Sequence, residues 1–498
     1  MNRRQFLRSA AAAGAVLGTA RFVRAAEGPS KRPNIILCMA DDQGWGDVGY
    51  NGHEVLNTPA LDEMAAAGLR LDRFYAAAPV CSPTRGSVMT GRTPNRFGCF
   101  SWGRTLRPQE VTVAEALKAA GYVTGHFGKW HLGPVYKNSP VNPGASGFDE
   151  WLSAPNFYDN DPILSRQGQA EKVPGESSTV AMDAALDFIR RHAKGDKPFL
   201  AVVWFGSPHN PHIASEEMKK PYADQPAKVQ QYLGEIAGID AAMGKLRRHL
   251  RSGGLRDNTL VWYCSDNGGV ANIARTGGRA GKGSIYEGGL RVPGIIEWPA
   301  RIPKPRTSNL PAVTSDIYPT LLELAGAKVG NQPPLDGVSL APLIAGDMTR
   351  RPPIGFWDFP GGGISTPSAK LMGDLLATQQ AGEEVTDPKM LAADAGKIQT
   401  QYPEDSFPGH AAWTDWPWKL HRIQGGGQGK KKAKGKQAPE TDTPAPAGGA
   451  RIELYNLADD PMEKQDLVSA QGDRAKAMRS ELEAWLKSVV KSLNGKDY

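Results

Sequence analysis

Two pairs of polar side chains follow apolar runs at distant points of the chain. Asp41 and Asp42 come directly after one run, and Asp266 and Asn267 come shortly after another. Adjacent carboxylates repel each other unless a cation or protons neutralise them. Three carboxylates and an amide carbonyl, without histidine or cysteine, are ligands that suit Ca²⁺ or Mg²⁺ better than Zn²⁺. The alternative is that both motifs only cap helices and turn the chain.

Basic side chains capable of anion binding and proton transfer also follow apolar runs. The segment GHFGKWHLG contains His126, Lys129 and His131, and the segment GSPHNPH contains His209 and His212. A single histidine at the end of a strand is usually structural. A lysine and several histidines converging with a cation indicate anion binding and proton transfer.

A glycine-rich segment, TGGRAGKGSIYEGGLRVP, adds Arg279 and Lys282. By itself this pattern is weak, because such segments often serve only as flexible connections.

The segment CSPTRGSVMTGR is predicted to form a helix that begins at Cys81 and ends at Gly91. The backbone N–H groups of a helix N-terminus favour an anion. A phosphotyrosine-phosphatase loop would need arginine six residues after its cysteine, but Ser87 stands there and the arginine is Arg85. No acid–base pair resembling that of a cysteine protease adjoins Cys81 either, so the pattern does not favour a thiol nucleophile.

Alternating helices and strands must position these side chains. Apolar runs predict buried strands over 34–40, 199–205 and 259–264. Helices are expected from a Thr58 cap to Gly68, from a Thr112–Glu115 capping box, and over 179–192 and 229–250. This order predicts a large, doubly wound, mostly parallel α/β sheet, which binds ligands beyond the carboxyl ends of its strands.

The alternation weakens after about residue 345. The segments PIGFW, PWKLHRI and RIELYNL predict short antiparallel strands, and DRAKAMRSELEAWLKSVV predicts an amphipathic helix. We therefore expect a catalytic domain over 30–345 and a smaller C-terminal α+β domain over 346–498. Within the latter, 425–449 reads as a disordered loop between two strands, with polyanion tethering by its lysines as the alternative. The segment 361–409 either shapes a substrate pocket or lies outside it.

The charge of +7 lies mostly at two places. Residues 1–25 hold five arginines and no acid, and GKKKAKGK holds five lysines, so the remainder is slightly acidic and does not predict a nucleic-acid surface. Residues 1–25 also read as a twin-arginine export signal, with Arg3-Arg4 before a short apolar stretch that cannot span a bilayer. A periplasmic or secreted protein that uses the twin-arginine translocase is expected.

Four cysteines make no disulfide framework, and Cys38, Cys99 and Cys264 are expected to be buried thiols.

The segments around these residues resemble those of the formylglycine-dependent type I sulfatases of the alkaline-phosphatase-like superfamily, in the arylsulfatase A and N-acetylgalactosamine-6-sulfatase branch. The resemblance rests on Cys81-x-Pro83-x-Arg85 and on NIILCMADDQGWGDVG, FGKWHLG, SPHNPH, SDNGG, EGGLRVP and LYNLADDPMEKQDL, in this order. It implies that a formylglycine-generating enzyme oxidises Cys81 to an aldehyde, whose hydrate attacks sulfur and then expels sulfate.

The resemblance also implies a role for each residue. One Ca²⁺ would be bound by Asp41, Asp42, Asp266, Asn267 and the modified Cys81. Arg85 would hold the hydrated aldehyde, and Lys129 and Lys282 would neutralise the sulfate oxygens. His131 would accept a proton, and His209, with Lys282, would protonate the departing alcohol.

A sulfated glycan is the expected substrate, because export and abundant tryptophan suit a sugar-stacking cleft. Trp102 and Arg104 are candidate contacts, with packing as the alternative for Trp102, and Asn156 is a candidate without an assigned role. Two other functions remain open. They are a phosphate or phosphonate ester hydrolase on the same scaffold and a catalytically silent glycan-binding protein.

Overall fold

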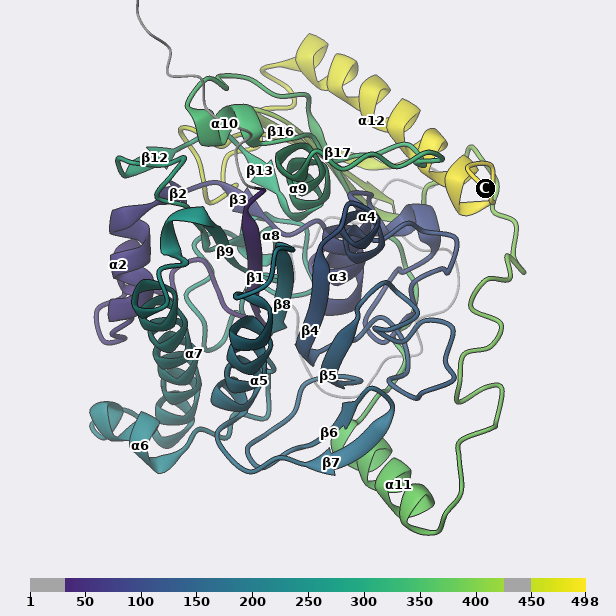
Figure 1. Ribbon diagram of the computed structural model, residues 1–498. Helices are drawn as coiled ribbons and strands as arrows, with labels where there is room; N and C mark the ends of the chain where they lie inside the picture. Colours follow the sequence, from purple (N-terminus) through teal and green to yellow (C-terminus); the bar gives the residue numbers. More distant parts are fainter. Residues whose placement is uncertain (1–31, 425–448) are drawn as a thin grey trace, which may run out of the picture. The chain divides into compact units, whose positions relative to one another are not determined.

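The computed structural model describes residues 32–424 and 449–498 (Figure 1). Of these, residues 33–424 and 449–498 belong to one compact unit. The predicted export signal and nearly all of the predicted loop 425–449 lie outside the described residues. No helix within the described ranges is long and apolar enough to cross a membrane.

A mixed sheet built from ten strands between residues 34 and 308 forms the centre of the unit. Its strands β9, β1, β8, β4 and β5 are adjacent and parallel, and antiparallel strands border them on both sides. In spatial order they are β12 (Arg306–Ser308), β2 (Leu69–Leu71), β11 (Gly294–Glu297), β9 (Thr259–Ser265), β1 (Asn34–Ala40), β8 (Phe199–Trp204), β4 (Val123–Lys129), β5 (Glu150–Ala154), β6 (Ile163–Arg166) and β7 (Gln169–Lys172). The prediction of a mostly parallel α/β sheet is confirmed.

Helices cover both faces of this sheet, since alternate residues of β1 enter two different hydrophobic cores. Ile35 and Leu37 pack in the core that contains α3 (Cys81–Thr90), α4 (Val113–Ala119) and α9 (Ile317–Ala325). Ile36 and Cys38 pack in the core that contains α2 (Pro59–Ala67), α5 (Ser177–His192) and α7 (Ala227–Ser252). Helices α5 and α7 lie side by side on their face (Figure 1). Because β1 is buried on both faces, its sequence is a continuous apolar run, which is the pattern from which the strand was predicted.

Most predicted elements match within two residues. The Thr112–Glu115 capping box is present at the start of α4. Thr58 is the N-cap residue of α2, as predicted, but its side chain makes no capping hydrogen bond. The Thr58 hydroxyl instead accepts a hydrogen bond from the backbone N–H of Gly49, at 2.8 Å. Cys38, Cys99 and Cys264 are buried and free, as expected, and Cys81 is also buried and free.

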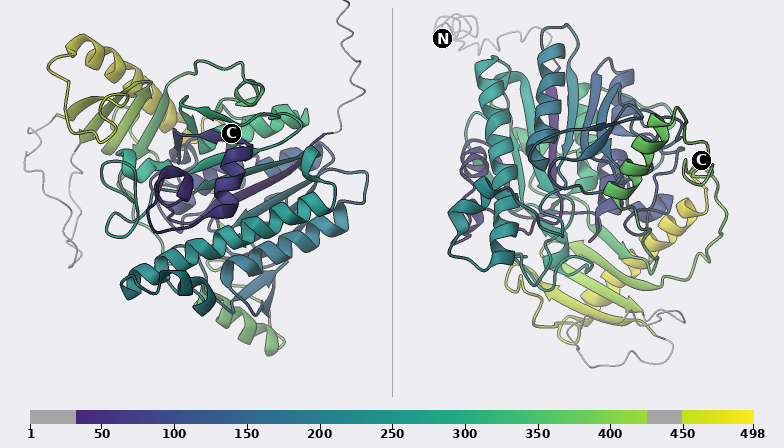
Figure 2. Two further views of the ribbon diagram at one scale, coloured as in Figure 1. Left: turned by 90° about the vertical axis from the view of Figure 1, so that its left-hand side faces the viewer. Right: turned by 90° about the horizontal axis from the view of Figure 1, so that it is seen from below.

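The C-terminal part contains an antiparallel sheet of four strands within residues 354–456. Its strands are β14 (Ile354–Asp358), β15 (Gly409–Asp415), β16 (Trp418–Gln424) and β17 (Arg451–Asn456). The predicted C-terminal helix is α12 (Gly472–Leu493), which packs along this sheet (Figure 2). Strand β15 was not predicted, and the domain boundary near residue 345 stays a prediction.

The remaining strands and α-helices complete the described part of the unit. They are β3 (Phe74–Tyr75), β10 (Arg291–Val292) and β13 (Ala312–Val313), which form a small sheet, and the helices α6 (Glu216–Lys219), α8 (Glu287–Leu290), α10 (Ala341–Ala345) and α11 (Ser368–Gln380).

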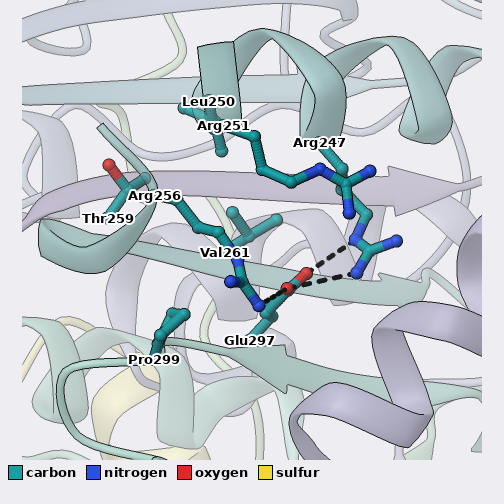
Figure 3. Close-up of a pocket in the computed structure, with 8 residues that line it drawn as sticks. All are labelled: Arg247, Leu250, Arg251, Arg256, Thr259, Val261, Glu297 and Pro299. Carbon is teal, nitrogen blue, oxygen red and sulfur yellow. Dashed lines mark hydrogen bonds and ion pairs between the residues drawn. The ribbon is translucent and has the colours of Figure 1, made fainter. Parts of the chain in front are cut away.

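A buried ion pair joins α7 to the antiparallel border of the sheet (Figure 3). The Glu297 carboxylate accepts hydrogen bonds from Nε and Nη2 of Arg247 at 2.7 and 3.2 Å, and from Arg256 at 3.4 Å. The adjacent cavity of about 10 Å³ has no room for a substrate. In the sheet, Glu297 of β11 lies opposite Val261, near the start of β9. The ion pair therefore lies at the sheet edge away from the carboxyl end of β9.

Replacing Glu297 with glutamine should lower the free energy of unfolding by about 2–3 kcal/mol, because Arg247 would lose its buried carboxylate partner and keep only the exposed Glu63, at 2.6 Å. Urea denaturation would measure this loss, and activity of the folded variant should be unchanged. Glu171→Gln, which removes the exposed pair with Arg166, is the matched control and should cost less than about 1 kcal/mol. Equal effects of the two substitutions would contradict a structural role for the buried pair.

Candidate active site

The side chains predicted to do chemistry gather at one edge of the central sheet. Asp41 and Asp42 follow the end of β1, Lys129 ends β4, and Asp266 follows the end of β9. His209 lies in the segment after β8. Because these four strands are parallel and adjacent, their carboxyl ends lie together, as the sequence predicted.

The acidic residues form one cluster with Cys81. Asp41, Asp42, Cys81 and His209 each offer a potential ligand atom, and these atoms all lie within 4.8 Å of one another. The backbone N–H of Asp42 donates to Oδ1 of Asp266 at 3.2 Å, and Nδ2 of Asn267 donates to Oδ1 of Asp42 at 2.7 Å.

The cluster fits a hard divalent cation. Oδ1 of Asn267 is buried and has no hydrogen-bond partner among the described residues. The Nδ2 atom of the same amide donates to the Asp42 carboxylate, so this oxygen is held beside the cluster. A buried oxygen without a hydrogen-bond partner destabilises the folded protein unless a cation or a water molecule binds it. Three carboxylates with an amide oxygen form the type of donor set that calcium prefers.

Cys81 is the first residue of α3 and is completely buried. Its thiol donates to Oδ1 of Asp41 across 3.6 Å. Burial raises the pKa of the Cys81 thiol to about 12, against the lowering effect of Lys129 and Lys282. The thiol is therefore protonated at neutral pH and is not poised as a thiolate nucleophile.

Three cationic side chains each bind one carboxylate of the cluster. Nζ of Lys129 lies 2.5 Å from Oδ2 of Asp41, Nζ of Lys282 lies 2.6 Å from Oδ2 of Asp42, and Nη2 of Arg85 lies 2.7 Å from Oδ2 of Asp266. Arg85 and Lys129 are completely buried. A buried lysine at the end of β4 and a buried arginine on α3 are expensive to desolvate, so their presence at this edge suits binding of an anion.

The electrostatics of the carboxylates follow from these pairs. Burial favours the neutral acid, but the neighbouring cations, Lys129 foremost, outweigh it and lower the pKa of Asp41. For Asp266, burial and then the charge of Asp41 raise the pKa to about 7. The two carboxylates thus compete for the same positive charge.

Two histidines border the cluster. Nε2 of His209 is 3.7 Å from Oδ2 of Asp42, and its ring stacks on Phe157 with the centroids 4.1 Å apart. Burial lowers the pKa of His209 to about 4, while Asp42 and Asp41 oppose the shift. His131 is buried, with Nε2 3.3 Å from the Thr366 hydroxyl and no partner for Nδ1 among the described residues. Burial lowers the pKa of His131 well below its usual value, and Lys129 adds to the shift.

Three of the seven non-glycine residues with positive φ among the described residues lie at this edge. Asp42, His131 and Ala280 adopt left-handed backbone conformations, with φ of 69°, 55° and 62°. Such conformations cost about 1–3 kcal/mol each for residues other than glycine and occur preferentially at functional sites. Each of the three lies in or beside a segment that carries a side chain of the cluster.

The segment that carries Lys282 is fixed to the C-terminal sheet. Nζ of Lys419 on β16 binds Oε1 of Glu287 at 2.9 Å, and the backbone N–H of Glu287 donates to Oε2 of Glu463 at 2.7 Å. Nη1 of Arg279 donates to the Tyr455 hydroxyl at 3.1 Å. Arg279 therefore anchors the glycine-rich segment and does not join the cluster.

Two further histidines in the predicted motifs also lie outside the cluster. His126 is buried beside Trp130 and Trp204, with Nδ1 2.7 Å from the Ser153 hydroxyl. His212 faces Glu235, with Nδ1 3.3 Å from the carboxylate.

Side chains that sequence patterns did not single out complete the surroundings. Phe157 stacks on His209, and Thr366 contacts His131 from the segment 361–409. Nδ2 of Asn156 donates to the same Thr366 hydroxyl at 3.2 Å, which places this candidate beside the site. No periodicity or motif could have indicated Thr366, because it lies in the irregular stretch that precedes α11.

Comparisons with known proteins agree with this geometry. The sulfatase family model matches residues 33–327. The chain is 34% identical to the N-acetylgalactosamine-6-sulfatase of Canis lupus familiaris over 372 residues, which covers 66% of this chain and 69% of that protein. It is also 34% identical to human arylsulfatase A over 356 residues, covering 64% and 68% of the two chains.

Among solved structures, Ps i-CgsB in complex with k-i-k-neocarrahexaose superposes with a TM-score of 0.72 and 25% identity, covering 91% of this chain and 93% of that one. The fold, the match over more than half of the chain and the assembled polar cluster lead to one conclusion. The chain belongs to the sulfatase family of the alkaline-phosphatase-like superfamily and is a sulfuric ester hydrolase.

Proposed function

We propose that this sulfatase hydrolyses sulfate esters of carbohydrates, using a formylglycine made from Cys81 and one bound calcium ion. The observation that carries the proposal is the position of Cys81, buried at the start of α3 with its sulfur 3.6 Å from a carboxylate of an oxygen-rich cluster. The names of similar proteins support a carbohydrate substrate, since they include an N-acetylgalactosamine-6-sulfatase and a protein solved in complex with k-i-k-neocarrahexaose.

The calcium ligands in this proposal are the carboxylates of Asp41, Asp42 and Asp266, the amide oxygen of Asn267 and the modified side chain of Cys81. When bound, the ion would supply positive charge that favours ionisation of the hydrated aldehyde and holds a sulfate oxygen. Arg85, one helical turn after Cys81, holds Asp266 in place and steadies the hydrated aldehyde.

Lys129 and Lys282 bind the sulfate oxygens and neutralise charge that builds up as the ester bond breaks. Lys282 also carries the proton for the departing alcohol, since Asp42 raises its pKa against the effect of burial. His209 faces the same Asp42 oxygen as Lys282 and hydrogen-bonds the leaving oxygen. His131, with its free Nδ1, accepts the proton when sulfate is expelled.

The reaction is tested by comparing turnover of 4-nitrophenyl sulfate and 4-nitrophenyl phosphate by protein produced together with the formylglycine-generating enzyme. We expect the sulfate to be preferred by at least about 10²-fold in kcat/KM. A preference for phosphate would support the phosphate or phosphonate hydrolase instead. No turnover of either ester, with binding of a sulfated glycan, would support a silent glycan-binding protein.

Calcium binding has a readout that does not depend on activity. Calcium added to chelator-treated protein should raise Tm by a few degrees, because a ligand at about 100 times its Kd stabilises the folded state by about 2.7 kcal/mol. Asp42→Asn should abolish this shift, since it removes one of the charges that hold the ion. The control Asp374→Asn, an exposed acid on α11, should keep it. An equal calcium shift in both variants would contradict the assigned site.

The proposed export route rests on the N-terminal segment. We propose that the twin-arginine translocase exports the folded chain to the periplasm or beyond. The prediction is a processed N-terminus after Ala25 in the periplasmic or secreted fraction, and an uncleaved chain confined to the cytoplasm would contradict it.

A further inference from the structure

A cavity of about 360 Å³ opens beside His131. One wall comes from the segment between Gly103 and Thr105 and the segment between His131 and Tyr136, both close to the proposed catalytic residues. The other wall comes from the 361–409 segment. The volume lies at the small end of the range of ligand pockets, which is about 300–1,000 Å³.

The outer wall is attached directly to the active-site region. The backbone N–H of Ile364 donates to the Trp102 carbonyl at 2.9 Å, and the next residue, Gly103, donates its N–H to the Ser82 hydroxyl at 2.8 Å. Ser82 is the neighbour of Cys81. Gly103 has a φ of 74°, and a Cβ there would lie 1.9 Å from the Ile364 carbonyl oxygen, so only glycine allows this close approach.

Exposed apolar side chains gather at the cavity. Ile364 and Met390 line it and are 50% and 40% exposed, and Trp102, which is 41% exposed, is hydrogen-bonded to Ile364. These are three of the seven large hydrophobic residues that are exposed among the described residues. Exposed apolar side chains gathered at a concave site indicate ligand binding rather than packing.

The cavity carries little net charge. Apart from His131 and Tyr136, its ionisable lining residues are one cation, Lys389, and one anion, Asp394, and no arginine lines it. The nearby guanidinium of Arg104 is engaged by the Gly362 carbonyl at 3.0 and 3.1 Å. Recognition of a carboxylate or a second sulfate generally uses an available arginine or lysine cluster, and one lysine opposite one aspartate does not provide it.

We infer that this cavity binds the alcohol portion of the substrate through apolar contacts, and that it selects a neutral sugar unit over a unit that bears a carboxylate. This inference rests on the proposed sulfate ester hydrolysis. The 361–409 segment, whose contribution the sequence left open, would then be the specificity element of this chain. Trp102 would contact the C–H face of the sugar at the rim.

The test compares two double variants on sulfated saccharides. Ile364→Ser with Met390→Ser removes the apolar wall, and Val55→Ser with Met462→Ser removes two residues of similar exposure elsewhere on the surface. The first pair should raise KM for a sulfated neutral galactoside about tenfold, with kcat changed less than twofold. The second pair should leave both values unchanged.

Two further measurements separate this inference from the proposed function. Inhibition by inorganic sulfate should be the same in both double variants, because sulfate contacts the lysines and not the cavity. The parent should prefer the neutral galactoside over a sulfated disaccharide that contains a uronate by about tenfold in kcat/KM. If the parent releases sulfate but the first pair leaves KM unchanged, or the uronate substrate is preferred, the inference is wrong and the sulfatase function stands. If the parent releases no sulfate from any ester, the proposed function itself fails.

Discussion

Replacing Cys81 with alanine should reduce release of sulfate from 4-nitrophenyl sulfate by about 10⁴-fold or more, to the background rate. The reason is that the proposed nucleophile is made from this side chain, so no neighbouring group can substitute for it. Lys129, Lys282 and the carboxylates would remain, and they bind the ester without attacking it. The loss should appear in kcat, while inhibition by inorganic sulfate persists.

The same substitution should leave the fold intact. The Cys81 sulfur makes one polar contact, with Asp41, so circular dichroism and Tm should change little. Cys38→Ala is a matched control, because Cys38 is an equally buried thiol in the core beneath the sheet and should retain activity. The mass of the peptide containing residue 81 should show conversion of the thiol to an aldehyde in active protein. Active protein with an unmodified peptide, or an active Cys81→Ala variant, would refute the proposed nucleophile.

The position of the cluster could be predicted because it depends on strand order alone. Residues that follow buried parallel strands must meet at one edge, so Asp41, Lys129 and Asp266 could be grouped from the sequence. The same argument would also place His126 in the cluster, which is wrong for a physical reason. It lies three residues before Lys129 on β4, and residues an odd number apart on a strand point to opposite faces. Its imidazole therefore enters the core beside the stacked rings of Trp130 and Trp204.

Contacts that join distant segments could not be predicted. The Thr58 hydroxyl suits a helix cap by type and position, yet the neighbouring turn provides the Gly49 N–H as a competing donor. The attachment of Glu287 to Lys419 spans more than a hundred residues and involves two buried charges that no periodic pattern marks. Thr366 reaches His131 from an irregular segment. In each case the hydrogen-bond or ion-pair partner depends on the tertiary fold, which a local sequence pattern does not reveal.

Replacing His209 with alanine should lower kcat for a sulfated sugar by about 10²-fold or more, because a sugar alkoxide is a poor leaving group and His209 would assist the transfer of a proton to it from Lys282. The loss on 4-nitrophenyl sulfate should be far smaller, since 4-nitrophenolate departs without a proton. The structure supports this role because His209 and Lys282 face the same oxygen of Asp42, at 3.7 and 2.6 Å. Stacking on Phe157 holds the imidazole in that position.

His212→Ala is the control for this experiment, because His212 lies three residues away but faces Glu235 instead of the cluster. It should retain the activity of the parent on both esters. Across a series of aryl and alkyl sulfates, the rate of His209→Ala should fall more steeply with leaving-group pKa than that of the parent. A loss that is independent of the leaving group would mean that His209 positions the substrate or the cation, because only a group acting on the departing oxygen makes the rate sensitive to the basicity of that oxygen.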